Sequence, residues 1–367
     1  MLPIVFDGIC AGSNLSFPQG YISGRLHKNP NSSSRLIQWI ERVEGADVRA
    51  GLELRAVGGD KLDDFPSAIT AVDQGKIPTS YLSRFGYAAP TPERVNEILG
   101  RFKKAIPLGD QNIRPNAINF LGAVYQRKTS EDDTSPIKDA EVRNLTWTIL
   151  ELTLDRRSSD DGYQRAEILE QLSDYDAARS SLLLLESLIV RGFGTIHDHE
   201  TRALVSLATQ HPRQTMESLG KFLMDSRRGM ILFIGKAATS IIDPIPAPVI
   251  MDWVRRTGVE GAQKIARILP TPFVTPTGKP VVPAVTLELL NEFGGDDQVC
   301  DNVVGGSFKS DSWWGNGGDH FRSKAATSRR FLSHENRCIR RWAQIATQRN
   351  EALAESEQLR HDERMLE

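Results

Sequence analysis

The sequence predicts an all-α protein, an α-solenoid built from degenerate helical hairpins. Three observations lead to this fold class. Apolar residues recur at helical spacing through most of the chain. Strand signals are sparse, because neither the alternating residues 52–56 nor the apolar pair 281–282 has a neighbouring run with hairpin turn chemistry. One-sided helices follow one another across short polar breaks, as in 321–331 and 337–346, and such hairpins need neighbours to cover their apolar faces.

The first third of the chain predicts four helices. After the polar residues 29–34, an apolar stripe at i, i+3, i+4 and i+7 runs from Leu36 to Val43. The clearest start is Thr91 followed by Pro92, because threonine is a favoured N-cap and proline is tolerated in the first turn. Gly75 is a typical stop after a helix. The predicted helices cover residues 36–43, 64–74, 91–102 and 116–125.

Beyond residue 136 the predicted helices follow one another more closely. The leucine block at 182–185 indicates that the helix around it is buried on more than one face. No fixed repeat length is visible, so the hairpins are expected to be degenerate. The predicted helices cover residues 142–152, 166–172, 177–189, 201–209, 214–224, 230–242, 249–254, 285–293, 321–331 and 337–346.

The pattern predicts three segments. The run 128–136 is too polar to pack and ends in proline, so we expect it to be an exposed loop and an internal boundary. A proline-rich connector starts at residue 270. The segments are therefore 1–127, with about the first 30 residues irregular, then 137–269 and 270–367. Residues 2–19 carry turn residues and no capped helix, and one interpretation is that the chain begins inside a larger protein.

The composition is that of an ordinary soluble folded protein. Of its 367 residues 40% are hydrophobic and 25% are charged, and the net charge of −2 argues against disorder and against a generally basic nucleic-acid coat. Cys10, Cys300 and Cys338 are odd in number and far apart, which favours free thiols in a reducing compartment. No apolar run approaches the roughly 20 residues that span a bilayer. The cytoplasm is the expected location.

The sequence offers no convincing catalytic set. His197 and His199 flank Asp198, but two positions apart they would diverge on a helix, whereas zinc-binding helices separate their histidines by four residues. His211 could supply a third ligand. We expect instead that Asp198 or Glu200 opens the next helix. The expectation is a protein that is not an enzyme and holds neither a metal nor a cofactor, with a metal-dependent hydrolase as a minor alternative.

The last hundred residues resemble a known class. In the hairpin 321–346 the second helix carries Arg337, Arg340, Trp342 and Ala343, and this pair of helices resembles HEAT-like repeats. The preceding stretch 289–315 is similar to C-terminal helical regions of large bacterial proteins. Several of these are antiviral STAND-type ATPases that use helical repeats to sense foreign protein. The resemblance implies a target-sensing or scaffolding array.

The nucleotide-binding part of that class is absent from this chain. A P-loop needs Ser or Thr after its Gly-Lys pair, yet residues 77, 222, 237 and 280, which follow the four Gly-Lys pairs, are Ile, Phe, Ala and Pro. ATP binding by this chain is therefore disfavoured. If the resemblance holds, an ATPase or effector portion would lie elsewhere in a longer polypeptide or in a partner.

Two features are candidates for partner binding. Residues 322–349 contain eight cationic side chains and only one acid, Glu335, and such a strip could bind an acidic protein surface or phosphates. Because acids interleaved with arginines follow from residue 351, a long solvated terminal helix with i,i+4 ion pairs is the alternative. The tryptophan pair before a glycine-rich loop is either an interface hot spot or a seal between hairpins. The candidate residues are Trp313, Trp314, Arg329, Arg330, Arg337, Arg340 and Arg341.

The function expected from the sequence is non-catalytic. The chain is expected to be a recognition or scaffold module that binds a large protein partner, and the resemblance implies the sensor region of a bacterial defence system. Nucleic-acid binding through the same basic strip is the alternative, and it requires an affinity that falls steeply with salt.

Overall fold

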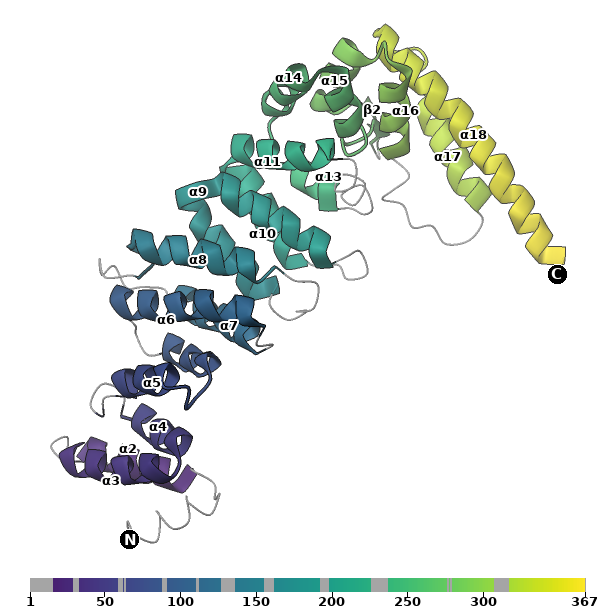
Figure 1. Ribbon diagram of the computed structural model, residues 1–367. Coiled ribbons are helices and arrows are strands. Elements are labelled where there is room, and N and C mark those ends of the chain that lie inside the picture. The colour runs from purple at the N-terminus through teal and green to yellow at the C-terminus, as the bar shows by residue number, and fades with distance from the viewer. Residues whose placement is uncertain are drawn as a thin grey trace. The chain divides into compact units, whose positions relative to one another are not determined.

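A computed structural model shows an all-α protein that divides into two compact units, Met1–Thr153 and Leu154–Glu367. Figure 1 shows the succession of helices in each unit. The structure describes residues 16–28, 33–58, 62, 64–87, 91–109, 112–126, 136–154, 162–191, 198–225, 237–275, 277, 279–306 and 317–366.

In the first unit, each element packs mainly on elements close to it in the chain. Helix α3 packs on α4, α4 on α5, and the long 3₁₀ helix η3 lies between α5 and the pair α6 and α7, on which α8 then packs. The elements are α2 (Ser16–Lys28), α3 (Ser33–Ala46), α4 (Val48–Ala56), α5 (Asp64–Asp73), η3 (Thr79–Tyr87), α6 (Pro92–Ala105), η4 (Ile106–Leu108), α7 (Ile113–Gln126), η5 (Pro136–Lys138) and α8 (Ala140–Leu152).

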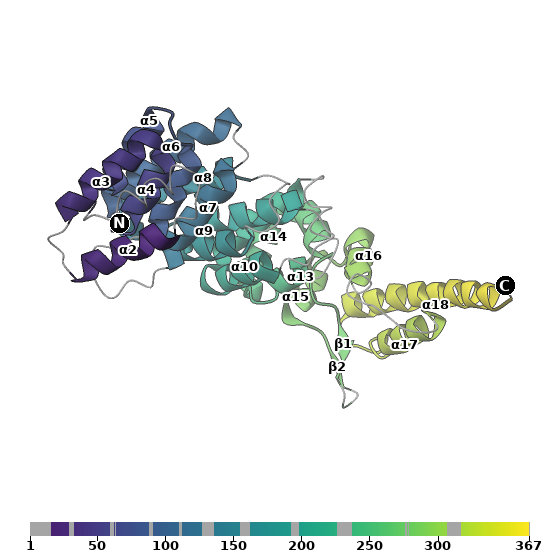
Figure 2. The ribbon, with the colours of Figure 1, turned by 90° about the horizontal axis from the view of Figure 1, so that it is seen from below.

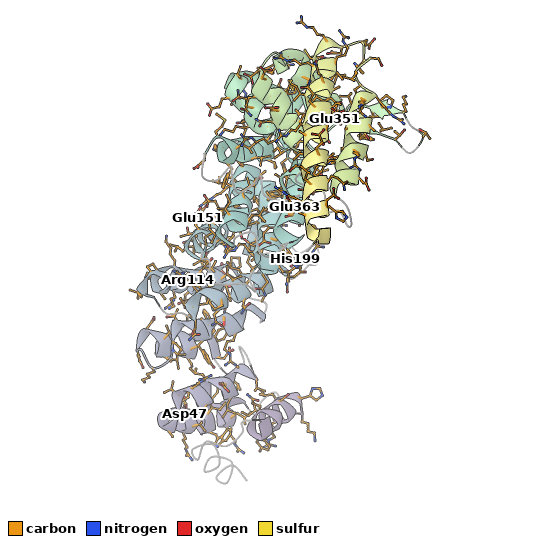
Figure 3. The ribbon with its side chains drawn as sticks, turned by 90° about the vertical axis from the view of Figure 1, so that its right-hand side faces the viewer. Asp47, Arg114, Glu151, His199, Glu351 and Glu363 are labelled. Carbon is orange, nitrogen blue, oxygen red and sulfur yellow. The ribbon has the colours of Figure 1, made fainter. Side chains whose placement is uncertain are left out.

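Side-chain caps fix the starts of three of these helices. The carboxylate of Asp47, labelled in Figure 3, accepts a hydrogen bond from the amide of Ala50 at 3.0 Å at the start of α4. Asp139 caps α8 in the same way. The predicted cap of Thr91 on α6 is confirmed, since its hydroxyl accepts from the Arg94 amide. Gly75, two residues after the end of α5, adopts a left-handed φ of 68°, which confirms the predicted stop.

A buried ion pair holds α3 to α4. The guanidinium of Arg55 donates two hydrogen bonds to the carboxylate of Glu44, at 2.5 and 2.9 Å, and a third to the Leu62 carbonyl at 2.7 Å. The Arg55 side chain is only 5% exposed. Because the bidentate geometry satisfies the buried charge, the pair fixes how the two helices cross.

The second unit repeats the same neighbour-to-neighbour packing. Helix α9 packs on α10 and α11, α11 on α14, α14 on α15 and α16, and α18 on α15, α16 and α17. The elements are α9 (Gly162–Arg191), α10 (Asp198–Gln210), α11 (Pro212–Met224), α13 (Ala237–Ile242), α14 (Ala247–Ile265), β1 (Phe273–Val274), β2 (Pro280–Val281), α15 (Ala284–Phe293), α16 (Asp297–Gly306), α17 (Gly317–Arg329) and α18 (Arg337–Leu366).

Helix α9 contains a break where the sequence predicts two helices. Asp176 has non-helical angles, φ −154° and ψ 84°, between the predicted helices 166–172 and 177–189. Its carboxylate accepts a hydrogen bond from the amide of Arg179 at 2.9 Å, as an N-cap does. The prediction of two helices in this stretch is therefore confirmed, because α9 consists of two helical segments that meet at Asp176.

The sequence missed several elements. Strands β1 and β2 form a short antiparallel hairpin, visible in Figure 2, in which Phe273 pairs with Val281. Helix α16 was not predicted, and α2 lies within the first 30 residues, which were expected to be irregular. The alternating residues 52–56 lie in α4. Residues 230–236 of the predicted helix 230–242 lie outside the described residues.

The compact units divide elsewhere than at the expected boundary. Most of 128–136 lies outside the described residues, and the first unit continues through α8 to Thr153, because α8 packs on α6 and α7. The proline-rich connector expected to begin at residue 270 lies within the second unit. Among the helices that the structure describes, none is long and apolar enough to cross a lipid bilayer.

Candidate functional site

The hairpin of α17 and α18 carries the predicted basic strip. Figures 1 and 2 show the two helices side by side. Both helices bury a mixture of small and large residues. The buried residues are Gly317, Gly318, Phe321, Ala325 and Ser328 on α17, and Ile339, Trp342, Ala343, Ala346, Thr347, Asn350 and Ala354 on α18.

The turn between these helices is rigidly built. Asn336 caps α18, because its side-chain oxygen accepts hydrogen bonds from the amides of Cys338 at 2.8 Å and Ile339 at 3.2 Å. The rings of Phe331 and Trp342 meet edge to face with centroids 5.6 Å apart. The amides at the start of α18 are therefore already occupied, and the polar break that the sequence places here is a structured turn.

Two arginines of the strip bind side chains on the opposite helix. Arg329 forms an ion pair with Glu351, which lies on α18 (Figure 3). Arg322 donates to Gln358 at 2.8 Å and also pairs with Asp319 on its own helix. These contacts set the register of α17 along α18. Sequence reasoning anticipated i,i+4 pairs within one helix, and it missed the pairs between helices, which lie 22 and 36 residues apart.

Arg341 connects α18 to the turn that precedes α16. Its guanidinium pairs with Asp297 and donates to the Gly295 carbonyl at 3.0 Å. Its side chain is 40% exposed, so this pair is partly screened by solvent. Arg329 and Arg341 thus have contacts within the chain, although both keep exposed surface.

The remaining candidates lie around the start of α18. Arg340 donates to the carbonyls of His334 at 2.6 Å and Glu335 at 2.7 Å, and these contacts leave its charge uncompensated. Arg337 is exposed and forms no ion pair with any residue that the structure describes. Arg330 is exposed at the first position of the turn, directly after α17. Positive charge therefore faces solvent at this end of the hairpin.

The second partner-binding feature lies outside the described residues. Trp313 and Trp314 both fall in the stretch 307–316. Whether they form a hot spot or a seal stays a prediction, which the separate replacement of each tryptophan by alanine would test: loss of thermal stability indicates a seal, and loss of partner binding at unchanged stability indicates a hot spot.

The histidine-rich group has structural contacts in its described part. His197 lies outside the described residues, while the Nδ1 atom of His199 lies 2.7 Å from the guanidinium of Arg202 and its ring meets Tyr163 at 5.0 Å. Glu200 is fully buried inside α10, where it accepts from Ser187 at 3.4 Å, and the helix begins at Asp198. Within the described ranges, no three acidic, histidine or cysteine side chains are grouped as a metal site would require.

A groove that the sequence did not predict lies in the first unit. It has a volume of about 550 Å³ and runs between the α3–α4 corner and α5. Val48 and Leu52 line it from α4, and Lys76 lies at its edge. The one acid in its lining, Glu44, is the partner of Arg55 and is thereby held in the helix interface.

The fold and these contacts define an all-α protein whose helices pack mainly on their sequence neighbours and whose last helix begins with the exposed arginines Arg337 and Arg340. In comparisons with known proteins, no protein-family model, no curated protein and no solved structure matches this chain.

Proposed function

We propose that this chain is a non-catalytic recognition or scaffold module that binds a large protein partner. The observation that carries the proposal is the neighbour-to-neighbour packing within each unit. In solenoids, each repeat contacts only its neighbours, and the stack leaves an extended surface for a partner. We accordingly interpret each unit as a row of degenerate, HEAT-like helical hairpins.

The non-catalytic part of the proposal rests on the contacts of the side chains that were candidates for a metal site, His199 and Glu200. His199 contacts Arg202 and Tyr163 at the surface, and Glu200 is buried against Ser187. The first of these three contacts lies within α10, and the other two join α10 to α9. The ion pairs of Arg329 and Arg341 likewise join α17 and the α16 turn to α18, so these polar side chains hold helices together.

The partner surface is placed at the start of α18. Arg337 and Arg340 present positive charge there, and the turn that carries them is held by the Asn336 cap and by the Phe331–Trp342 contact. The positive charge of this surface favours an acidic partner. Because the turn is already held in place, binding does not incur the free-energy cost of ordering it. Arg329 and Arg341 instead hold α17 and the α16 turn against α18 through their ion pairs.

A pull-down with a charge-matched control tests the proposal. The variant Arg330→Glu with Arg337→Glu reverses two charges at the proposed surface. The control, Arg213→Glu with Lys279→Glu, makes the same change in net charge at exposed positions elsewhere in the second unit. We expect the first variant to capture at least about tenfold less partner than the unsubstituted protein, and the control to capture nearly as much as the unsubstituted protein. The two variants should have equal melting temperatures. Equal capture by both variants would contradict the proposed surface.

Nucleic-acid binding through the same cations is the second candidate. Arg337 and Arg340 would then contact phosphates, and log affinity would fall steeply and linearly with log salt concentration. Fluorescence anisotropy with labelled single-stranded and double-stranded oligonucleotides between low and physiological salt decides the point. A steep salt slope that disappears in the Arg330→Glu, Arg337→Glu variant would favour nucleic acid over a protein partner.

A role as the sensor region of a bacterial defence system rests on the resemblance of the last hundred residues alone. In that case an ATPase or effector portion belongs to a longer polypeptide or to a separate protein. The genomic neighbourhood of the coding sequence is the direct check, since an adjacent ATPase or nuclease would support this role.

A further inference from the structure

Two cysteines meet where α18 packs against α16. Cys300 is fully buried on α16, and its thiol lies 3.5 Å from the carbonyl oxygen of Gly294. Cys338, half-buried in the first turn of α18, borders the same glycine, because a Cβ placed on Gly294 would lie 3.1 Å from the Cβ of Cys338. Both cysteines therefore lie next to Gly294.

The ion pair beside them supports this juxtaposition. Arg341 pairs with Asp297, and these two residues lie one helical turn from Cys338 and Cys300 respectively. Residues three apart on a helix share a face. The faces of α16 and α18 that carry the cysteines are thus the faces that the ion pair already holds together.

We propose that Cys300 and Cys338 form a reversible disulfide that fixes the start of α18 to α16 when the protein meets a peroxide. Disulfide formation requires Cα atoms within about 7 Å and Cβ atoms aimed at one another. Packing of both cysteines around one glycine favours such an approach, because glycine has no side chain to separate them.

The chemistry assigns different roles to the two thiols. The accessible Cys338 thiolate attacks one peroxide oxygen, the O–O bond breaks, and a sulfenic acid forms while hydroxide leaves and takes up the proton that the thiol had lost, giving water. The Cys300 thiolate then attacks that sulfur, the S–S bond forms, and hydroxide leaves and is protonated to water. Two thiols lose two electrons and two protons in total, and hydrogen peroxide is reduced to two molecules of water.

The environment of Cys300 suits the second role. Burial raises the pKa of its thiol to about 11, and a negative charge on Cys338 raises it further, whereas Arg341 opposes the rise. A buried thiol with a raised pKa reacts slowly with a peroxide in solution. It becomes a nucleophile toward a sulfur held beside it, where proximity compensates for the small thiolate fraction.

The disulfide would fix the position of the proposed partner surface relative to α16. It would join α16 to the first turn of α18, next to Arg337 and Arg340, through two residues that are distant in sequence. Disulfides constrain the unfolded chain, so the oxidised form should also unfold at a higher temperature than the reduced form.

Mass spectrometry tests the proposal on the full chain. A Cys10→Ser variant, which removes the third thiol, is treated in its folded state with hydrogen peroxide at a few equivalents. Remaining thiols are alkylated, and the protein is digested without reductant. We expect a peptide pair joined through Cys300 and Cys338, lighter by two hydrogen atoms than the two free peptides, which disappears after dithiothreitol. Recovery of Cys300 in alkylated form, with Cys338 alkylated or overoxidised, would overturn the proposal.

A relocated thiol provides the matched control. The variant Cys300→Ala with Asp301→Cys, also in the Cys10→Ser background, moves the thiol by one residue to an exposed position that points away from the shared face. It should yield no cross-link to Cys338 although its thiol is more accessible. A cross-link of similar yield in this control would show that proximity on the folded helices is not the cause. Far-ultraviolet circular dichroism confirms that each variant is folded.

Discussion

At the scale of single residues, the charges that matter most for stability are buried. Arg55 is 4% exposed and binds both Glu44 and the Leu62 carbonyl, whereas Arg49, on the same helix, pairs with Glu53 while its side chain is 74% exposed. Removal of one partner from a buried pair leaves an uncompensated charge, while exposed pairs contribute little. The two arginines of α4 should therefore differ strongly in their effect.

Replacement of these arginines measures that difference. We expect Arg55→Met to lower the free energy of unfolding of the first unit by about 3 kcal/mol in urea denaturation. The control Arg49→Met should lower it by less than about 1 kcal/mol. If the two substitutions cost the same, the ion pair does not hold α3 to α4.

The cap of α8 gives a prediction with a defined pH dependence. Hydrogen bonds to the Asp139 carboxylate, first from the Val142 amide and then from Asn96, hold its pKa below the ordinary value of 3.8. A lowered folded-state pKa means that the carboxylate stabilises the fold above pH 3.8 and that this contribution is lost as the pH falls through the folded-state value.

Asp139→Ala should accordingly cost about 1 kcal/mol in the free energy of unfolding at pH 7, a typical N-cap value. The loss should shrink progressively below pH 3.8, because the protonated side chain caps less well. Asp139→Asn, which keeps the accepting oxygen, is the control and should cost less at pH 7. A loss from Asp139→Ala that is constant across this pH range would show that the charge of the cap has no role.

At the scale of elements, helix packing depends on one glycine in the second unit. A Cβ at Gly220 of α11 would lie 2.2 Å from the Nε1 atom of Trp253, which is 4% exposed on α14. The indole is enclosed by the core and has little room to move. The close approach of α11 to α14 therefore requires glycine at this position.

Gly220→Ala should destabilise the second unit by about 1 to 3 kcal/mol in thermal or urea unfolding, although alanine favours helix. Gly305→Ala, on α16 where a Cβ would meet no atom within 4 Å, is the control. It should be neutral or stabilise by up to about 1 kcal/mol. A gain in stability from both substitutions would contradict the packing of α11 on α14.

The elements also show which features were readable from the sequence. Helices with a one-sided apolar stripe and a clear cap, such as α6 after Thr91, were predicted, because both signals are local. The break at Asp176 falls between two apolar segments, 166–172 and 177–189, which were predicted as separate helices. Helix α16 was missed although Val299, Val303 and Val304 are buried at helical spacing, because it has only ten residues and ends in two glycines, which disfavour helix. The β1–β2 hairpin was missed because each strand has only two residues.

The positive charge of the candidate site could be predicted from the sequence, but the contacts of its arginines could not. The excess of arginines between 322 and 349 is a property of the sequence, but the partners of Arg329 and Arg341 lie on other helices. Such pairs depend on how α17, α18 and the α16 turn pack together. The adjacency of Cys300 and Cys338 depends on the same packing, because these two cysteines are 38 residues apart in the sequence.

At the scale of the whole molecule, the account rests on the local character of packing within each unit. Elements that lie far apart in sequence within one unit share little contact, so no single core joins them all. In a stack of this kind, stability is approximately a sum of element and neighbour terms, and opening can occur locally. Exposed surface along such a stack is what the proposed recognition function requires.

Native-state hydrogen exchange of the full chain, with and without Arg55→Met, tests this claim most directly. We predict that the substitution accelerates amide exchange in α3, α4 and the adjoining α5, while α7 and α8 of the same unit keep the protection that they have in the unsubstituted protein. An equal increase in exchange from α3 through α8 would show that the unit opens as one cooperative core, and it would contradict the neighbour-to-neighbour stack.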